Sequence, residues 1–436
     1  EPLLRGSAGS KQIEVNSQGR VMRELGRSEG TPGADVTLTI DGALQSYVQA
    51  RLGDDSAAAV VIDVENGDIL AIGSAPSFDP NLFVRGISSA DYNALMEDNH
   101  RPLAAKTVQG TYPPGSTFKM VVALAALDAG LITPEDTFYC NGYIEVSGRR
   151  AHCWKRGGHG KVDLQHSLQH SCDVYYYELS QLIGIEKISE MAQRLGLGVR
   201  HDLPMSAVAE GLAPTKDWKR TKQNAEWRIG DTLNAGIGQG YVLASPLHLA
   251  VMTARIATGR AVEPRLIKAI NGQEQPLRGG ALLGLNETHL AQVRAGMSAV
   301  VNERTGTAHN SRVLTRAARM AGKTGTSQVR NITAAERERG VISNDDLPWE
   351  RRDHALFVAF APTDAPKIAV SLIVEHGGGG SAAAAPIARD ILLQALYQGT
   401  PPLSAYPESQ RIRISNERKL LRLKTPLSPP APSKRA

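Results

Sequence analysis

The sequence predicts an α/β protein of the α+β kind, in which one antiparallel sheet is built from both ends of the chain. A hairpin pattern lies within the first 75 residues, and a second pair of strand patterns lies near the other end. The segments between them read as mainly helices and loops. This order favours a single sheet closed by both chain ends, with helices on its faces, over separate α and β domains.

The composition is that of a globular protein with a large core. The chain has 436 residues, of which 42% are hydrophobic, and this length suggests two or three domains. Lys and Arg number 49 against 44 Asp and Glu, without the clustered basic face of a nucleic-acid-binding protein. No apolar run is long enough to span a bilayer. Because the chain starts at Glu1 and not at Met, we expect that a membrane anchor has been removed from it.

The N-terminal part predicts a short polar segment followed by a capped helix. Residues 1–35 are polar and glycine-rich, and the alternating stretch Gln12–Val21 predicts one or two strands without a core of their own. Asp41 is a favourable N-cap for a helix that ends near Leu52. The apolar stripe of this helix comprises Leu44, Tyr47, Val48 and Leu52.

A hairpin supplies the first two strands of the predicted sheet. Residues 58–64 are apolar and rich in β-branched side chains, which favours a buried strand. Asn66-Gly67 is the strongest short-range turn signal, and residues 69–75 return as the second strand.

The C-terminal part supplies the remaining strands. Residues 355–361 and 368–375 form a second strand pair, followed by a helix over about 386–397. A further strand is predicted over 319–329. The tail, 401–436, is rich in proline and basic residues, and we expect it to be mostly disordered.

Ser116 and Lys119 form the first chemical motif. The turn Tyr112-Pro113-Pro114-Gly115 ends any preceding element, and helix formers follow it. At a spacing of three residues the two side chains share a helical face, so the amine can remove the hydroxyl proton. The turn also leaves backbone N–H groups unpaired beside the hydroxyl. The alternative is that Ser116 caps the helix and Lys119 is a solvated side chain.

Two further motifs follow in the chain. Ser171 and Asp173 lie two residues apart on a predicted interhelical loop, so on extended backbone both side chains face one cleft. The segment 323–326 reads Lys-Thr-Gly-Thr on a predicted strand, whose edge can bind an extended peptide while its polar groups hold a carboxylate. The alternative is an ordinary edge strand whose lysine discourages aggregation. S-x-x-K, S-x-[DN] and K-T-G in this order are the motif set of penicillin-recognising serine enzymes.

On these motifs the chain resembles the class B penicillin-binding proteins, and among them the penicillin-binding protein 2 group that cross-links the wall during elongation. The resemblance covers about residues 10–400 and implies a penicillin-binding/β-lactamase-like transpeptidase fold. It divides the chain into a remnant of an N-terminal pedestal domain (1–35), the transpeptidase domain (36–400) and the tail (401–436). Asp173 stands where most relatives have Asn, and an acidic residue there is a feature of this group. Further matching stretches are 14–16, 19–21, 77–83, 86–89, 109–112 and 236–241.

The resemblance implies a peptidoglycan D,D-transpeptidase and β-lactam target. Ser116 would be acylated by the D-Ala-D-Ala end of a stem peptide with Lys119 as its base, and Ser171 and Asp173 would relay protons and contact the substrate. The peptide backbone and its terminal carboxylate would be bound by Lys323, Thr324, Gly325 and Thr326. The N–H groups of Ser116 and Thr326 would form the oxyanion hole, and an amine of a neighbouring strand would then accept the acyl group.

The three cysteines and one histidine suggest a metal site. Cys140, Cys153, His159 and Cys172 have the spacing C-x12-C-x5-H-x12-C, and three thiolates with an imidazole complete a tetrahedral zinc site. The alternatives are one disulfide with a buried thiol, or three buried thiols. Because some Gram-negative relatives carry zinc at aligned positions, the resemblance favours zinc, which would support the Ser171 to Asp173 loop from behind. Asp136 and His152 are close enough in sequence to replace a ligand.

Two other functions remain open at this point. A D,D-carboxypeptidase or β-lactamase-type hydrolase needs a group that activates water at the acyl-enzyme, and no deacylating Glu can be assigned. A β-lactam sensor without turnover needs a transmembrane signalling segment.

The resemblance also implies where the protein works and with what. It would be held in the bacterial inner membrane by a single-pass anchor, with its catalytic domain in the periplasm. Its partners would be a SEDS-family glycosyltransferase (RodA) and an MreC-type scaffold protein, and the chemistry itself would need no cofactor.

Overall fold

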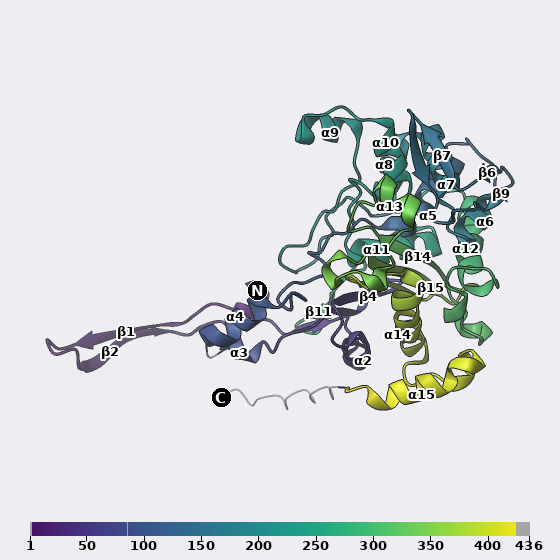
Figure 1. Ribbon diagram of the computed structural model, residues 1–436. Coiled ribbons are helices and arrows are strands. Elements are labelled where there is room, and N and C mark those ends of the chain that lie inside the picture. Colours follow the sequence, from purple (N-terminus) through teal and green to yellow (C-terminus); the bar gives the residue numbers. More distant parts are fainter. Residues whose placement is uncertain (1, 85, 424–436) are drawn as a thin grey trace.

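A five-stranded antiparallel sheet forms the centre of the protein (Figure 1), whose computed structural model describes residues 2–84 and 86–423. The strand order is β14-β15-β16-β4-β5. The two ends of the chain meet between β16 and β4, where Val374 lies opposite Ala57. The predicted fold, with one sheet made from both chain ends, is confirmed. The strand bounds are Ala57–Asp63 (β4), Ile69–Ala75 (β5), Ala321–Ser327 (β14), His354–Ala361 (β15) and Ile368–Val374 (β16).

Both faces of the sheet are buried, each in its own core. Along β4, Ala58 and Val60 belong to one core and Ala59 and Val61 to the other, because successive strand side chains point to opposite faces. Figure 1 shows α2 and α14 below the sheet and α5 and α11 above it. The bounds of these helices are Gly42–Leu52 (α2), Lys119–Asp128 (α5), Pro246–Thr258 (α11) and Ala385–Tyr397 (α14).

Helix α2 follows its predicted boundaries. The carboxylate of Asp41 accepts hydrogen bonds from the N–H groups of Ala43 and Leu44, at 2.9 and 3.0 Å, and so caps the first turn. The four side chains of the predicted apolar stripe are all buried. The helix lies on β5, which positions the N-terminal hairpin of the sheet.

The middle of the chain is mainly helical and lies above the sheet (Figure 1). The longest helix, α12, has 16 residues, and no helix in the described part of the chain is long and apolar enough to cross a membrane. The helices are Leu164–Gln169 (α6), Asp173–Ile183 (α7), Ile185–Arg194 (α8), Lys216–Gln223 (α9), Ile229–Gly236 (α10), Glu287–Asn302 (α12) and Ala334–Arg339 (α13).

Short strands form small sheets around this body. They are Val36–Leu38 (β3) with Ile267–Ile270 (β11) and Gln273–Glu274 (β12), Phe138–Cys140 (β6) with Gly160–Val162 (β9), Tyr143–Val146 (β7) with Arg149–His152 (β8), and Arg260–Val262 (β10) with Gly279–Leu282 (β13).

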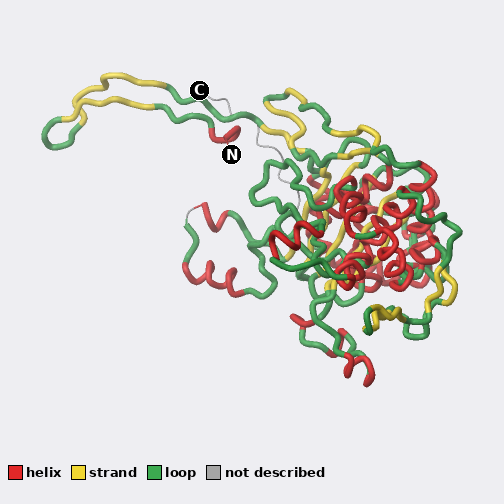
Figure 2. The backbone as a smooth tube through the Cα atoms, turned by 90° about the horizontal axis from the view of Figure 1, so that it is seen from above, coloured by secondary structure: helices red, strands yellow, loops and turns green. Residues whose placement is uncertain are grey.

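The N-terminal residues form an arm that extends away from the body (Figures 1 and 2). Its two antiparallel strands are Ser10–Val15 (β1) and Val21–Ser28 (β2), and almost all of their residues are exposed. The prediction of strands without a core of their own therefore describes this segment well. Three short helices complete the N-terminal part of the fold: Pro2–Arg5 (α1), Asn81–Val84 (α3) and Ser89–Glu97 (α4).

The expectation of a disordered tail is wrong for residues 401–423, whereas 424–436 lie outside the described residues. Helix α15 (Arg411–Leu420) follows a segment in which Tyr406 is completely buried. The guanidinium groups of Arg389 and Arg418 lie 4.7 and 5.0 Å from the centre of the Tyr406 ring. Burial of the Tyr406 ring and its contacts with these two guanidinium groups order the segment. The proline-rich and basic composition of the segment does not reveal these contacts.

Candidate active site

Ser116 lies in a 3₁₀ turn (Gly115–Phe118, η1) that leads directly into α5. The prediction that Ser116 opens a helix is confirmed, with a tighter first turn than expected. Gly115 has φ +54°, and a Cβ on it would lie 2.3 Å from the carbonyl oxygen of Thr326. Its N–H donates to the carbonyl of Gly238 at 2.8 Å. Gly115 and Gly238 thus let the Ser116 turn, the Gly238 loop and β14 approach one another closely beside the Ser116 hydroxyl.

Lys119 is fully buried behind this turn. Its Nζ lies 2.7 Å from Oδ1 of Asp173, 2.9 Å from the carbonyl oxygen of Ser171 and 3.3 Å from Oγ of Ser171. Within the described residues no hydrogen bond joins Lys119 to Ser116, whose hydroxyl faces the cleft without a partner. Lys119 therefore connects the start of α5 to the Ser171 to Asp173 segment.

Ser171 and Asp173 face the same side for a reason other than the predicted one. Ser171 has φ +54°, in the left-handed region, and Asp173 is the first residue of α7, so the segment is not extended. The second oxygen of Asp173 accepts the N–H of Trp154 at 2.9 Å. The Ser171 and Asp173 side chains face the same cleft, as expected. The cause is the left-handed backbone of Ser171 just before α7 begins, and not an extended strand.

Lys323, on β14, is the fourth member of the group that also contains Lys119, Ser171 and Asp173. Its Nζ lies 2.8 Å from Oγ of Ser171 and 3.1 Å from the carbonyl of Thr324, and the side chain is fully buried. Burial, and then the charge of Lys119, hold the pKa of Lys323 well below its usual range, while Asp173 acts in the opposite direction. Because Lys119 and Lys323 both contact the Ser171 hydroxyl, this direction of the pKa favours the neutral form of Lys323.

The open side of the site is a cleft of about 1700 Å³. Strand β14 is an edge strand that pairs only with β15 in the described sheet, so its other edge is available beside the cleft. A Cβ on Gly325 would lie 3.0 Å from the carbonyl of Pro114, which explains why glycine stands here. The predicted residues that line the cleft are Ser116, Ser171, Asp173, Thr324, Gly325 and Thr326, with Lys119 and Lys323 buried behind them.

Three polar residues contact the site without having been predicted. Thr307 Oγ1 lies 2.8 Å from Oγ1 of Thr324. Gln239 Nε2 donates to the carbonyl of Thr326 at 2.9 Å. Trp154 holds the Asp173 carboxylate and also donates its indole N–H to the carbonyl of Ser171 at 3.1 Å. Only Gln239 had a sequence signal, because it lies in the pattern Gly-x-Gly-x-Gly over 236–240.

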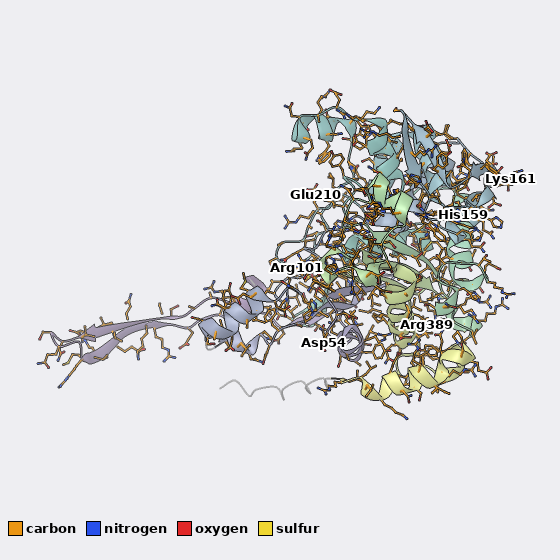
Figure 3. The ribbon with its side chains drawn as sticks, in the orientation of Figure 1. Asp54, Arg101, His159, Lys161, Glu210 and Arg389 are labelled. Carbon is orange, nitrogen blue, oxygen red and sulfur yellow. The ribbon has the colours of Figure 1, made fainter. Side chains whose placement is uncertain are left out.

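The four predicted metal ligands come together beside the Ser171 to Asp173 segment, of which Cys172 is the middle residue. Each of Cys140, Cys153, His159 and Cys172 offers a ligand atom, and all four atoms lie within 4.8 Å of one another. His159 Nδ1 lies 3.5 Å from Sγ of Cys153 and 3.7 Å from Sγ of Cys140. Two thiolates on one tetrahedral zinc lie about 3.8 Å apart, so this arrangement fits the ion. Figure 3 labels His159 in the helical half of the molecule.

One of the two alternatives for the cysteine cluster, a disulfide with a buried thiol, disagrees with the structure. All three cysteines are free and buried, so no disulfide is formed among them. Asp136 and His152 are not part of the group of four among the described residues. The Asp136 carboxylate instead accepts the N–H of Thr133 at 2.7 Å.

Comparisons with known proteins agree with this geometry. The family model of the penicillin binding protein transpeptidase domain matches residues 57–393. Peptidoglycan D,D-transpeptidase MrdA of Haemophilus influenzae is 37% identical over 427 residues, which cover 96% of this chain and 65% of that protein. The chain spans less than two thirds of these curated relatives, since it covers 61% of the MrdA of Escherichia coli K12.

Two solved structures extend the comparison to three dimensions. The crystal structure of Pseudomonas aeruginosa PBP2 in complex with WCK 5153 is 37% identical with a TM-score of 0.76, over 86% of this chain and 82% of that one. The complex between PBP2 and MreC from Helicobacter pylori contains a chain 34% identical with a TM-score of 0.76, over 91% of this chain and 70% of that one. The chain therefore belongs to the penicillin-binding protein transpeptidase family, and the resemblance to penicillin-binding protein 2 read from its motifs is confirmed.

Proposed function

We propose that the protein is a serine D,D-transpeptidase that forms peptide cross-links in peptidoglycan during cell-wall elongation and is inhibited by β-lactams. The observation that carries this proposal is the unpartnered hydroxyl of Ser116 in the cleft, next to the buried group of Lys119, Ser171, Asp173 and Lys323. The MrdA relatives, which are peptidoglycan D,D-transpeptidases, support it.

In the first step, Ser116 Oγ attacks the carbonyl carbon between the two D-Ala residues of the donor peptide. The C–N bond breaks, an ester forms and the terminal D-Ala leaves as an amine. Lys119 accepts the hydroxyl proton as the base, and the Ser171 hydroxyl, in contact with both lysines, passes a proton to the leaving amine. The N–H groups of Ser116 and Thr326 stabilise the oxyanion, and Thr324 and Thr326 with Lys323 hold the terminal carboxylate.

In the second step an amine of a neighbouring peptide attacks the ester. A new amide bond forms, the ester C–O bond breaks, and Ser116 recovers its proton through the same groups. The described lining of the cleft contains no glutamate, so the deacylating glutamate of class A β-lactamases has no counterpart there. This observation favours transfer to an amine over hydrolysis by water.

A labelled penicillin tests the proposal. A stable covalent adduct on Ser116, together with cross-linked product from lipid-linked peptidoglycan, is the expected result. Rapid release of the label would show a hydrolase. A stable adduct without cross-linked product in the presence of the polymerising partner would show a sensor.

We propose that Cys140, Cys153, His159 and Cys172 hold a structural zinc ion. Support comes from the four converging N and S atoms, with Nδ1 of His159 3.5 Å from Sγ of Cys153 and 3.7 Å from Sγ of Cys140. Bound zinc would supply a rigid attachment for Cys172, between Ser171 and Asp173, and take no part in the chemistry. Elemental analysis of metal-replete protein tests this proposal, with one zinc per chain expected.

We propose that the protein acts at the inner membrane, held there by a single-pass anchor, with its catalytic domain in the periplasm. In this arrangement, 1–35 belong to a pedestal domain that binds an MreC-type scaffold, 36–400 form the transpeptidase domain, and a SEDS-family glycosyltransferase (RodA) supplies new glycan strands. The solved complex of penicillin-binding protein 2 with MreC supports the scaffold assignment. Co-purification of the membrane-anchored protein with each partner, with and without 1–35, tests it.

A further inference from the structure

The cleft holds five arginines that the proposed chemistry does not use. Arg149 and Arg150 lie in β8, Arg156 follows Cys153, Arg228 precedes α10, and Arg337 lies in α13. We call these five residues the arginine wall. They line the same cleft as Ser116, Thr324 and Thr326, so one extended ligand can contact both.

The positive charge of the arginine wall is largely uncompensated. Among the described residues, only Arg150 has a carboxylate within 4.0 Å, that of Glu145 at 3.8 Å. The two aspartates that line the cleft are already paired, Asp173 with Lys119 at 2.7 Å and Asp231 with Lys219 at 2.5 Å. The cleft therefore presents five guanidinium groups and no available carboxylate in its described lining.

We infer that the arginine wall binds the free carboxylates of an acidic peptide substrate, so that the enzyme selects stem peptides with ionised side carboxylates over amidated ones. This inference rests on the proposed function and names the substrate class of the same site. Guanidinium groups bind carboxylates through paired hydrogen bonds, and a cleft lined by one sign of charge concentrates ligands of the other sign. Both the donor and the acceptor peptide carry such side carboxylates, and the experiment below determines which of the two peptides the arginine wall contacts.

The experiment measures cross-linking by the membrane-anchored protein with four substrate pairs, in which the donor, the acceptor, both or neither has its side carboxylates amidated. Each protein is characterised by the ratio of kcat/KM for free and amidated substrate. A loss of folded protein lowers both values equally and cancels in this ratio. The variant is Arg149→Gln/Arg156→Gln. The control is Arg20→Gln/Arg422→Gln, which removes the same charge from exposed positions outside the cleft.

For the wild type and the control we expect a preference for free carboxylates of about 1.4- to 5-fold, since an exposed ion pair contributes about 0.2–1 kcal/mol. The variant should reduce the ratio towards 1, and added salt should reduce it in the wild type. Whichever peptide shows the effect is the one that contacts the arginine wall. Equal rates with free and amidated peptides in the wild type would overturn the inference while leaving the function intact. Failure of Ser116 to be labelled by penicillin would overturn the function itself.

Discussion

The Nζ atom of Lys119 lies 2.7 Å from Oδ1 of Asp173, and this ion pair joins the start of α5 to the start of α7. Lys119 is fully buried, whereas the Asp173 side chain keeps 14% of its exposure at the cleft. The carboxylate thus sets the charge balance of two lysines, since Lys323 contacts the same Ser171 hydroxyl as Lys119.

Asp173→Asn should shift the pH dependence of acylation. The Asp173 charge raises the pKa of Lys323 against the larger lowering by burial and by Lys119. Because Lys323 contacts the same Ser171 hydroxyl as Lys119, a charged Lys323 disfavours transfer of the Ser116 proton to Lys119, so the acylation rate should fall as pH drops through the pKa of Lys323. Removal of the Asp173 carboxylate lowers this pKa and moves that limb to lower pH. The measurement is the rate of labelling by penicillin from about pH 5 to pH 9. A limb that moves to higher pH would contradict the assignment.

Ser116→Ala should abolish covalent labelling and leave the fold intact. The hydroxyl has no partner among the described residues, so the free energy of unfolding should change by less than about 0.5 kcal/mol. Intact-protein mass spectrometry with penicillin and a urea unfolding curve give the two readouts. The control Ser381→Ala, in the same cleft, should label fully. A persistent adduct in Ser116→Ala would refute the choice of nucleophile.

Gly238→Ala should distort the turn that carries Ser116. A Cβ at Gly238 would lie 2.2 Å from the carbonyl oxygen of Gly115, whereas a Cβ at Gly53 meets nothing within 4 Å. Both residues have positive φ, so the control Gly53→Ala contributes the backbone strain alone. We expect Gly238→Ala to be destabilised by about 2 kcal/mol more than Gly53→Ala and to label more slowly. Equal stability and labelling of the two variants would rule out the proposed close packing.

Removal of the proposed zinc should slow acylation through the Ser171 to Asp173 segment. Chelation, or Cys153→Ser, should reduce the zinc content towards zero and the labelling rate about 10-fold or more. Asp136→Asn is the matched control, because Asp136 is close in sequence but outside the cluster, and it should keep its zinc. Metal-replete protein without zinc, or a Cys–Cys bridge seen by mass spectrometry, would exclude the site.

His201 should make the protein sensitive to acid. Burial, and then the charges of His248 and Arg255, lower the pKa of His201 to about 3 in the folded state. Between that value and its unfolded pKa, the unfolded state binds the proton, so stability present at neutral pH is lost as pH falls below about 6.5. By pH 4 this loss is about 3 kcal/mol. Urea unfolding at neutral pH and at pH 4 should show a smaller loss in His201→Gln, and an unchanged one in the exposed control His166→Gln.

Local patterns were sufficient for the sheet and the positions of the motifs. The Asn66-Gly67 turn and the apolar runs on either side of it predicted β4 and β5 within one residue at each end. The cap at Asp41 and the spacing of its apolar stripe predicted α2 in the same way. Such features depend on neighbours a few residues apart, which the sequence displays directly.

The tail and the arginine wall could not be predicted in this way. Tyr406 orders the C-terminal segment only because Arg389 and Arg418 are brought to its ring from other elements. The arginine wall collects side chains from residues as far apart as Arg149 and Arg337, none of which belongs to a recognisable motif. Composition gives the average polarity and charge of a segment, but it does not show which side chains from distant segments will contact it in the folded protein.

By itself, the sequence predicted the residues that we propose for the chemistry, the order of the strands along the chain and the four side chains that come together as the proposed metal site. Only the tertiary structure decided that Lys119 pairs with Asp173, that Ser171 adopts a left-handed conformation between two lysines, and that β14 leaves an edge beside the cleft. The physical reason is distance along the chain. Lys119 and Ser171 are separated by 52 residues, and Ser171 and Lys323 by 152, so their contacts and charge balance exist only after both ends of the chain have joined one sheet.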